Sequence, residues 1–147
     1  MLIEALVGIL IFSIGILAMV GLQAVSMRNS IEAKYRSDAS YLANAIVSQM
    51  WTDANLTTYA HKPVDGATPC SPSGGDSGNG RVTAWLAAVA QTLPSAAAAR
   101  QQIVVTQPAV PVDSPIVSRN IVTVTVCWMS PQDQTWHNFR TVAYVNR

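Results

Sequence analysis

Four side chains of this 147-residue chain are of the types that bind transition metals or form cross-links. They are two cysteines and two histidines: Cys70, Cys127, His61 and His137. Such a set can hold zinc, but zinc sites carry their ligands in close pairs such as C-x-x-C or H-x-x-x-H. No such pair occurs in this sequence. We therefore predict a disulfide between Cys70 and Cys127, no metal site and no cofactor.

A disulfide between these cysteines is typical of an oxidising, exported compartment. It would tie a polar loop to a later strand, and the chain-entropy model gives it a stabilisation of roughly 4 kcal/mol. Cys127 falls on the threonine-bearing face of its strand. The loop must therefore either cross that face or reach it from an edge of the sheet.

The stretch Gly75–Gly78 reads GDSG and is similar to the loop that holds the nucleophilic serine of trypsin-like proteases. That chemistry requires a positioned histidine base, an orienting aspartate and an oxyanion hole. Only His61 precedes the motif, in a proline-flanked loop, and the chain is too short for two β-barrels. No phosphate-binding glycine loop and no pair of carboxylates stands out elsewhere. We expect a solvated loop and no enzymatic activity.

The most informative ionisable residue is Glu4, which precedes an uncharged apolar stretch over residues 5–22. At about 1.5 Å per residue, this N-terminal segment is long enough to cross a hydrocarbon core of about 30 Å. A cleavable signal peptide would need basic residues before the stretch and a small-residue cleavage site after it. No lysine or arginine occurs before Arg28. We therefore predict that residues 1–27 form a transmembrane or filament-core helix.

Helical periodicity continues beyond the apolar stretch. Apolar residues recur at three- and four-residue steps, and the charged residues lie mostly off this stripe. The stripe comprises Ile31, Tyr35, Ala39, Leu42, Ile46 and Met50. The first proline is Pro63, so we expect one helix over about residues 2–52, near 75 Å long. Its amphipathic half would belong to a head domain, residues 28–147.

The middle of the chain changes composition. Residues 53–81 are rich in proline, glycine, serine, aspartate and asparagine, and predict a long loop with little regular structure. Residues 82–93 carry apolar side chains at helical spacing and are followed by Pro94, which predicts a short helix.

Three later segments alternate in the manner of β-strands, within a sheet region over residues 102–146. They are residues 102–107, 120–129 and 135–145. The second has an apolar face of Val122, Val124, Val126 and Trp128. The prolines before it predict a turn or a sheet edge: Pro108, Pro111 and Pro115. An antiparallel sheet of three to four strands would cover the amphipathic half of the long helix, which gives an α+β fold.

Glu4 needs a physical explanation within this architecture. A carboxylate in an apolar helix costs several kcal/mol in lipid unless it is paired. One interpretation keeps Glu4 hydrated at the membrane interface. The other pairs it with the helix macrodipole and with a free α-amino group, its own or that of a neighbouring subunit.

The opening segment MLIEALVGILIFSIGILAMVGLQ resembles the N-terminus of processed type IV pilins and pseudopilins. In that family a prepilin peptidase exposes an N-terminal residue that is then methylated, and the glutamate is usually the fifth mature residue. Here the glutamate is the fourth, so we expect one residue before Met1, or a start methionine in its place. The resemblance implies that Glu4 pairs with an adjacent subunit's N-terminus and sets the axial register of a filament.

Further segments narrow the resemblance. FSIGILAMVGLQ and RSDASYLANAIVSQM, and more loosely TAWLAAVAQTLP and VTVTVCW, are similar to PilV-type minor pilins. This implies a pilin-like fold and a structural subunit that helps prime pilus assembly or forms part of the tip, with roles in adhesion and twitching motility. The implied partners are other pilin subunits, the inner-membrane assembly platform and prepilin peptidase.

The implied location is the bacterial inner membrane, with the head in the periplasm, and then the extracellular pilus. A minor pseudopilin of type II secretion and a major pilin share the same N-terminal features and stay open as alternatives. The net charge of +1, without a basic cluster, disfavours a nucleic-acid partner.

Three glycines interrupt the apolar half of the helix: Gly8, Gly15 and Gly21. Gly21 stands where many major pilins carry a helix-breaking proline. These glycines would allow local melting or close approach of helices, although glycine is also ordinary in transmembrane helices.

Overall fold

The computed structural model describes residues 2–66, 68–107, 119–132 and 134–146. Its elements in chain order are α1 (Leu2–Met50), the 3₁₀ helix η1 (Leu56–Tyr59), α2 (Gly80–Thr92), the 3₁₀ helix η2 (Ala98–Arg100), β1 (Gln102–Thr106), β2 (Arg119–Met129) and β3 (Trp136–Asn146). The chain divides into two compact units, Met1–Tyr35 and Arg36–Arg147. The fold is α+β, as predicted.

Helix α1 changes character along its length. None of the described residues 2–38 is buried, whereas the second half buries one stripe: Ala39, Leu42, Ala43, Ile46, Val47 and Met50. These positions follow three- and four-residue steps, so they lie on one face of the helix. The helix ends at Met50, two residues before the predicted end, because the Thr52 and Asp53 N–H groups donate three residues back instead of four.

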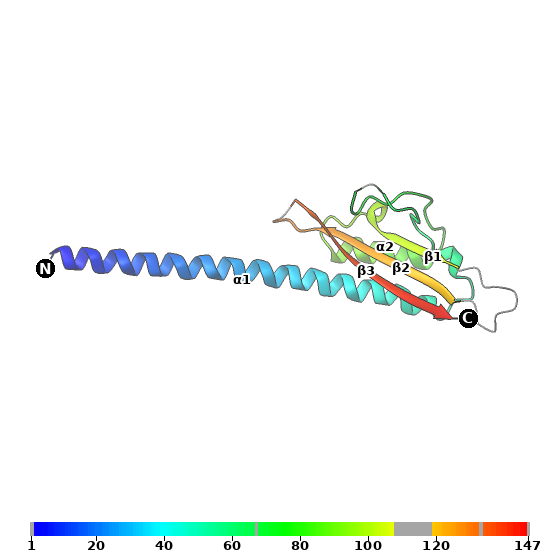
Figure 1. Ribbon diagram of the computed structural model, residues 1–147, viewed down its shortest axis with the longest axis horizontal. Coiled ribbons are helices and arrows are strands. Elements are labelled where there is room, and N and C mark those ends of the chain that lie inside the picture. Colours follow the sequence, from blue (N-terminus) through cyan, green and yellow to red (C-terminus); the bar gives the residue numbers. More distant parts are fainter. Residues whose placement is uncertain (1, 67, 108–118, 133, 147) are drawn as a thin grey trace. The chain divides into compact units, whose positions relative to one another are not determined.

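The sheet has three antiparallel strands, with β2 between β1 and β3 (Figure 1). Its apolar face is confirmed, because the four predicted β2 residues are all buried: Val122, Val124, Val126 and Trp128. Val124 pairs with Ile103 of β1 and with Thr141 of β3. The opposite face of β3 is largely open, with Asn138, Arg140, Val142 and Tyr144 exposed. The predicted proline turn at Pro108, Pro111 and Pro115 lies outside the described residues.

Helix α2 completes the core. It begins at Gly80, two residues before the predicted start, because the Asn79 side chain accepts a hydrogen bond from the Arg81 N–H and caps the helix. Its buried residues are Val82, Trp85 and Val89. The Trp85 indole N–H donates to the Leu42 carbonyl over 2.8 Å, which ties α2 directly to α1.

The region 53–81 contains more regular structure than predicted. It includes η1, whose N-cap Asn55 accepts a hydrogen bond from the Thr57 N–H. It also includes two isolated β-bridges, His61 with Ile103 and Val64 with Ser73. A polar composition signals turns, but it does not reveal backbone pairing with a distant strand such as β1.

Tyr59 makes a pH-dependent contribution to stability. Its side chain is fully buried, and its hydroxyl donates to the Asp53 carboxylate over 2.6 Å. Burial, together with this hydrogen bond, raises the pKa of Tyr59 above its ordinary value of about 10. The folded chain therefore holds the phenolic proton more tightly than the unfolded chain does. This stabilisation is complete below pH of about 10 and is lost as the pH rises through the folded-state pKa.

We expect Tyr59→Phe to lower the free energy of unfolding by about 1–2 kcal/mol at pH 8, because it removes a hydrogen bond to a carboxylate. The same variant should lose less stability than the wild type as the pH rises above about 10. Denaturant unfolding of the full chain in detergent, followed by circular dichroism between pH 8 and 11, measures both effects. Tyr144→Phe is the control, since Tyr144 is exposed. Parallel pH profiles for wild type and Tyr59→Phe would contradict the expectation.

Candidate functional site

Glu4 lies in the first turn of α1 and is exposed. The adjacent apolar side chains are exposed as well, Ile3 by 75% and Leu6 by 62%. Helix α1 contains an 18-residue window that is long and apolar enough to cross a membrane, and none of that window is buried within the structure. These side chains therefore need lipid or another protein around them. Met1, which belongs to the predicted processed N-terminal region, lies outside the described residues.

The three glycines of the apolar half lie within unbroken helix. At Gly8, Gly15 and Gly21, an added Cβ would meet nothing within 4 Å. Nothing in the described part of the chain therefore requires glycine at these positions. The prediction that they serve local melting or close helix approach concerns a membrane or an assembly, where partner helices are present.

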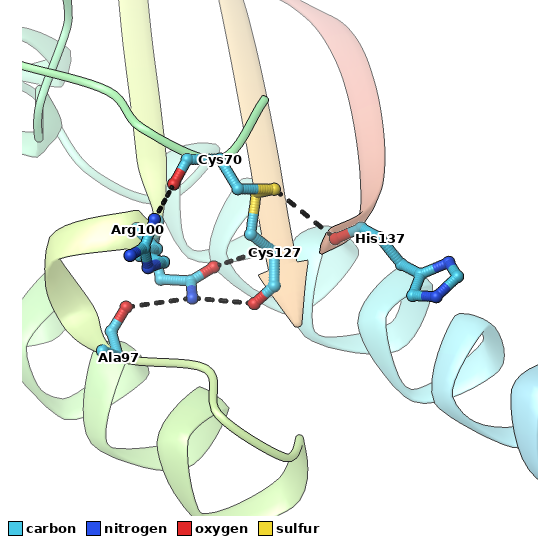
Figure 2. Close-up of a disulfide and its surroundings, with 6 residues drawn as sticks. Cys70, Ala97, Arg100, Cys127 and His137 are labelled. Atoms are coloured by element: carbon cyan, nitrogen blue, oxygen red, sulfur yellow. Dashed lines mark hydrogen bonds between the residues drawn. A yellow bond between two sulfur atoms is a disulfide. The ribbon is translucent and has the colours of Figure 1, made fainter. Parts of the chain in front are cut away.

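Cys70 and Cys127 form the predicted disulfide, with Cα atoms 5.7 Å apart (Figure 2). Both cysteines are buried. Since Cys127 lies on the face of β2 that points away from the apolar core, the loop crosses that face. The Gln102 amide donates to Asp65 of the same loop over 2.9 Å, which supports this path.

Two residues that precede β1 hold the disulfide in place. The Gln101 side chain is fully buried and pairs with both backbone groups of Cys127, accepting from its N–H and donating to its carbonyl. Arg100 donates to the Cys70 carbonyl over 3.0 Å, a contact that Figure 2 shows beside the disulfide. The sequence does not predict this role for Gln101 or Arg100, because a glutamine or an arginine before a strand carries no local signal of it.

His61, Asp76 and Ser77 come together in space, although the GDSG stretch is predicted to be a solvated loop. His61 is buried, and its Nδ1 accepts from the Ser77 backbone N–H over 3.2 Å. Its Nε2 lies 3.1 Å from the Ala98 carbonyl, so the neutral ring with a proton on Nε2 satisfies both contacts. Asp76 is exposed, with its Oδ1 3.7 Å from His61 Nδ1.

This cluster does not have the geometry of a nucleophile and its base. The Ser77 hydroxyl donates to the Thr58 carbonyl over 2.6 Å, and the imidazole receives the backbone N–H of Ser77 instead. The arrangement anchors the loop that leads into α2. Across the described ranges, no group of three or more histidine, cysteine, aspartate or glutamate side chains is placed to hold a metal.

The comparisons with known proteins give no relative. No protein-family model, curated protein or solved structure matches this chain. Two features stand out: the exposed apolar half of α1 headed by Glu4, and the cross-linked loop over the sheet.

The His61 anchor is testable by substitution. We expect His61→Leu to lower the free energy of unfolding by about 1–3 kcal/mol, because it leaves the Ser77 N–H without its acceptor and removes one of the two donors to the Ala98 carbonyl, the other being the Gln101 N–H. Lys62→Gln is a matched neighbouring control. It removes the Lys62–Asp76 pair, whose carboxylate is exposed, and the exposed hydrogen bond from Lys62 Nζ to the Gly74 carbonyl, so its effect should stay below about 1 kcal/mol. Equal effects of the two substitutions in thermal unfolding would refute the anchoring role.

Proposed function

We propose that this chain is a minor pilin of a type IV pilus, of the PilV type. It is a structural subunit that helps prime assembly or forms part of the tip. The observation that carries the proposal is Glu4 at the head of an exposed apolar helix that continues without a break into an α+β head. The alternatives that share this feature are a minor pseudopilin of type II secretion and a major pilin.

The physical argument begins with the two environments of α1. The apolar half has no cover within the described chain, whereas the half from Ala39 to Met50 is buried in the head. A subunit that waits in a membrane and then packs into a filament core meets both requirements, since lipid and neighbouring helices are equally apolar. The head would lie in the periplasm before assembly and on the pilus surface afterwards.

Glu4 would give such a helix one preferred axial position in a filament. In lipid, its carboxylate is costly unless water or a cation reaches it. In a bundle of parallel helices, the free α-amino group of a neighbouring subunit would supply that cation at one axial offset only. A single buried polar contact is known to fix register in helix assemblies. Glu4 would therefore favour assembly and also select one axial position.

The test is the fate of the protein in cells that make surface filaments. We expect it in the inner membrane and, at a low ratio to the major subunit, in filaments that have been sheared and purified. Quantitative mass spectrometry of the two fractions measures this ratio. Recovery from the membrane alone would favour the pseudopilin, and a ratio near one would favour the major pilin. Recovery from neither fraction would exclude all three.

A further inference from the structure

One stretch of the sequence matches the acceptor motif for N-linked glycosylation, which is Asn-x-Ser/Thr with x other than proline. It is Asn55-Leu56-Thr57, and its asparagine is the N-cap residue of η1. Bacterial transferases that use this motif also select an acidic residue two positions before the asparagine, and Asp53 occupies that position. Residues 53–57 therefore carry the complete acceptor pattern.

The side-chain nitrogen of Asn55 is the atom that would carry a glycan, and the fold leaves it available. The Oδ1 atom of the same amide accepts two hydrogen bonds, from the Thr57 N–H over 3.2 Å and from the Thr57 hydroxyl over 2.7 Å. The Nδ2 atom has no hydrogen-bond partner among the residues that the structure describes, and Asn55 is exposed. The amide is thus held by its oxygen, and its nitrogen is left to water.

A glycan at this position is compatible with the folded head. Asn55 caps η1 through Oδ1, and substitution on Nδ2 leaves that oxygen free to keep its two hydrogen bonds. Because Asn55 is exposed, a bulky hydrophilic group can extend into solvent. The Cys70–Cys127 disulfide is typical of an exported compartment, which is where this modification takes place.

We propose that Asn55 is the acceptor of an N-linked oligosaccharide, transferred from a polyprenyl diphosphate by a membrane-bound transferase. The proposal takes from the proposed function only the bacterial setting and the export of the head. In the transfer, Nδ2 of Asn55 forms a bond to C1 of the first sugar, and the bond between C1 and the diphosphate oxygen breaks. The polyprenyl diphosphate leaves, and one amide proton passes to a base of the transferase.

The folded head restricts when this transfer can occur. Leu56, in the middle of the motif, is only 4% exposed. The Asp53 carboxylate accepts from the Tyr59 hydroxyl over 2.6 Å and lies 3.5 Å from the Arg81 guanidinium. A transferase that binds residues 53–57 must displace these contacts, which requires local opening of the folded chain. The modification therefore precedes folding of the head, when the chain emerges from the membrane.

The experiment is production of the full chain in bacterial cells that contain a bacterial oligosaccharyltransferase and its lipid-linked oligosaccharide. The intact mass of the protein purified from the membrane fraction measures modification, and peptide mapping gives its position. We expect a population of chains that is heavier by one oligosaccharide at Asn55, and no such population in cells without the transferase. An unmodified mass, in cells that glycosylate a protein with an established acceptor site, would overturn the proposal. Neither result depends on filament assembly, so this test and that of the proposed function can fail separately.

Variants separate the acceptor role of Asn55 from its capping role. Asn55→Asp keeps a capping oxygen and removes the amide nitrogen, so glycosylation should be lost while the melting temperature of the unmodified protein stays unchanged. Thr57→Val should abolish the modification and Thr57→Ser should retain it, because the motif requires the hydroxyl group. Asn44→Gln is the control, since Asn44 is exposed but has no serine or threonine two positions later. A glycan that persists in Asn55→Asp or Thr57→Val would refute the assignment.

Discussion

Replacing Glu4 with alanine is expected to leave the protein in the membrane and to remove most of it from sheared filaments. If the chain is a pilin subunit, as proposed, the substitution leaves the α-amino group of a neighbouring subunit in an apolar environment without a counter-charge. Breaking a buried pair in this way costs about 3–5 kcal/mol. Every 1.4 kcal/mol changes an equilibrium about tenfold, so recovery in filaments should fall by at least about two orders of magnitude.

Two variants make the Glu4 result interpretable. Glu4→Asp keeps the charge on a shorter side chain and should assemble partially. Ile3→Ala removes apolar surface from the adjacent exposed position and should assemble normally. Mass spectrometry of membrane and filament fractions gives the ratio for each. Assembly of Glu4→Ala at the wild-type ratio would mean that Glu4 is only a hydrated carboxylate at the membrane interface.

Removal of the disulfide is expected to produce the largest loss of stability in the head. The bond closes a loop with a sequence separation of 57 residues, for which the chain-entropy model gives about 4 kcal/mol. The double variant Cys70→Ala, Cys127→Ala should lose about 2–5 kcal/mol of unfolding free energy. Alanine is preferred to serine because Cys127 is fully buried and a hydroxyl there would need a partner.

Reduction provides an independent check of the same bond. Treatment of the wild type with a thiol reductant should lower its thermal stability toward that of the double variant. The same treatment of the double variant should have no effect, which separates the disulfide from any other action of the reductant. A wild type that keeps its melting temperature after complete reduction would refute the stabilising role.

Local patterns in the sequence predicted the helices and strands whose apolar residues recur at one regular spacing. The alternation in residues 120–129 gave both the strand and its apolar face, and the stripe from Ala39 to Met50 gave the buried side of α1. These predictions hold because burial on one face acts on residues a few positions apart. The Cys70–Cys127 pairing followed because the chain has no other cysteine.

The path of the loop could not be predicted in the same way. It depends on partners far apart in the sequence, such as His61 with Ala98 and Gln102 with Asp65. No periodicity relates these pairs, and each residue type occurs in many other contexts. The strand residues beneath the loop, such as Gln102 and Thr125, are ordinary strand residues in the sequence, and the position of the loop over them follows only from these long-range contacts.

The cross-link also limits how far the chain can lengthen under mechanical tension. A pull applied at the two ends reaches Cys70 from one side and Cys127 from the other, and then passes through the sulfur–sulfur bond. The 57-residue separation would add about 200 Å of contour length if the bond were open, at roughly 3.3–3.6 Å per residue. While the disulfide is intact, this length is not available for extension. Helix α2, strand β1 and the segment between them therefore bear no load, even after the rest of the head has unfolded.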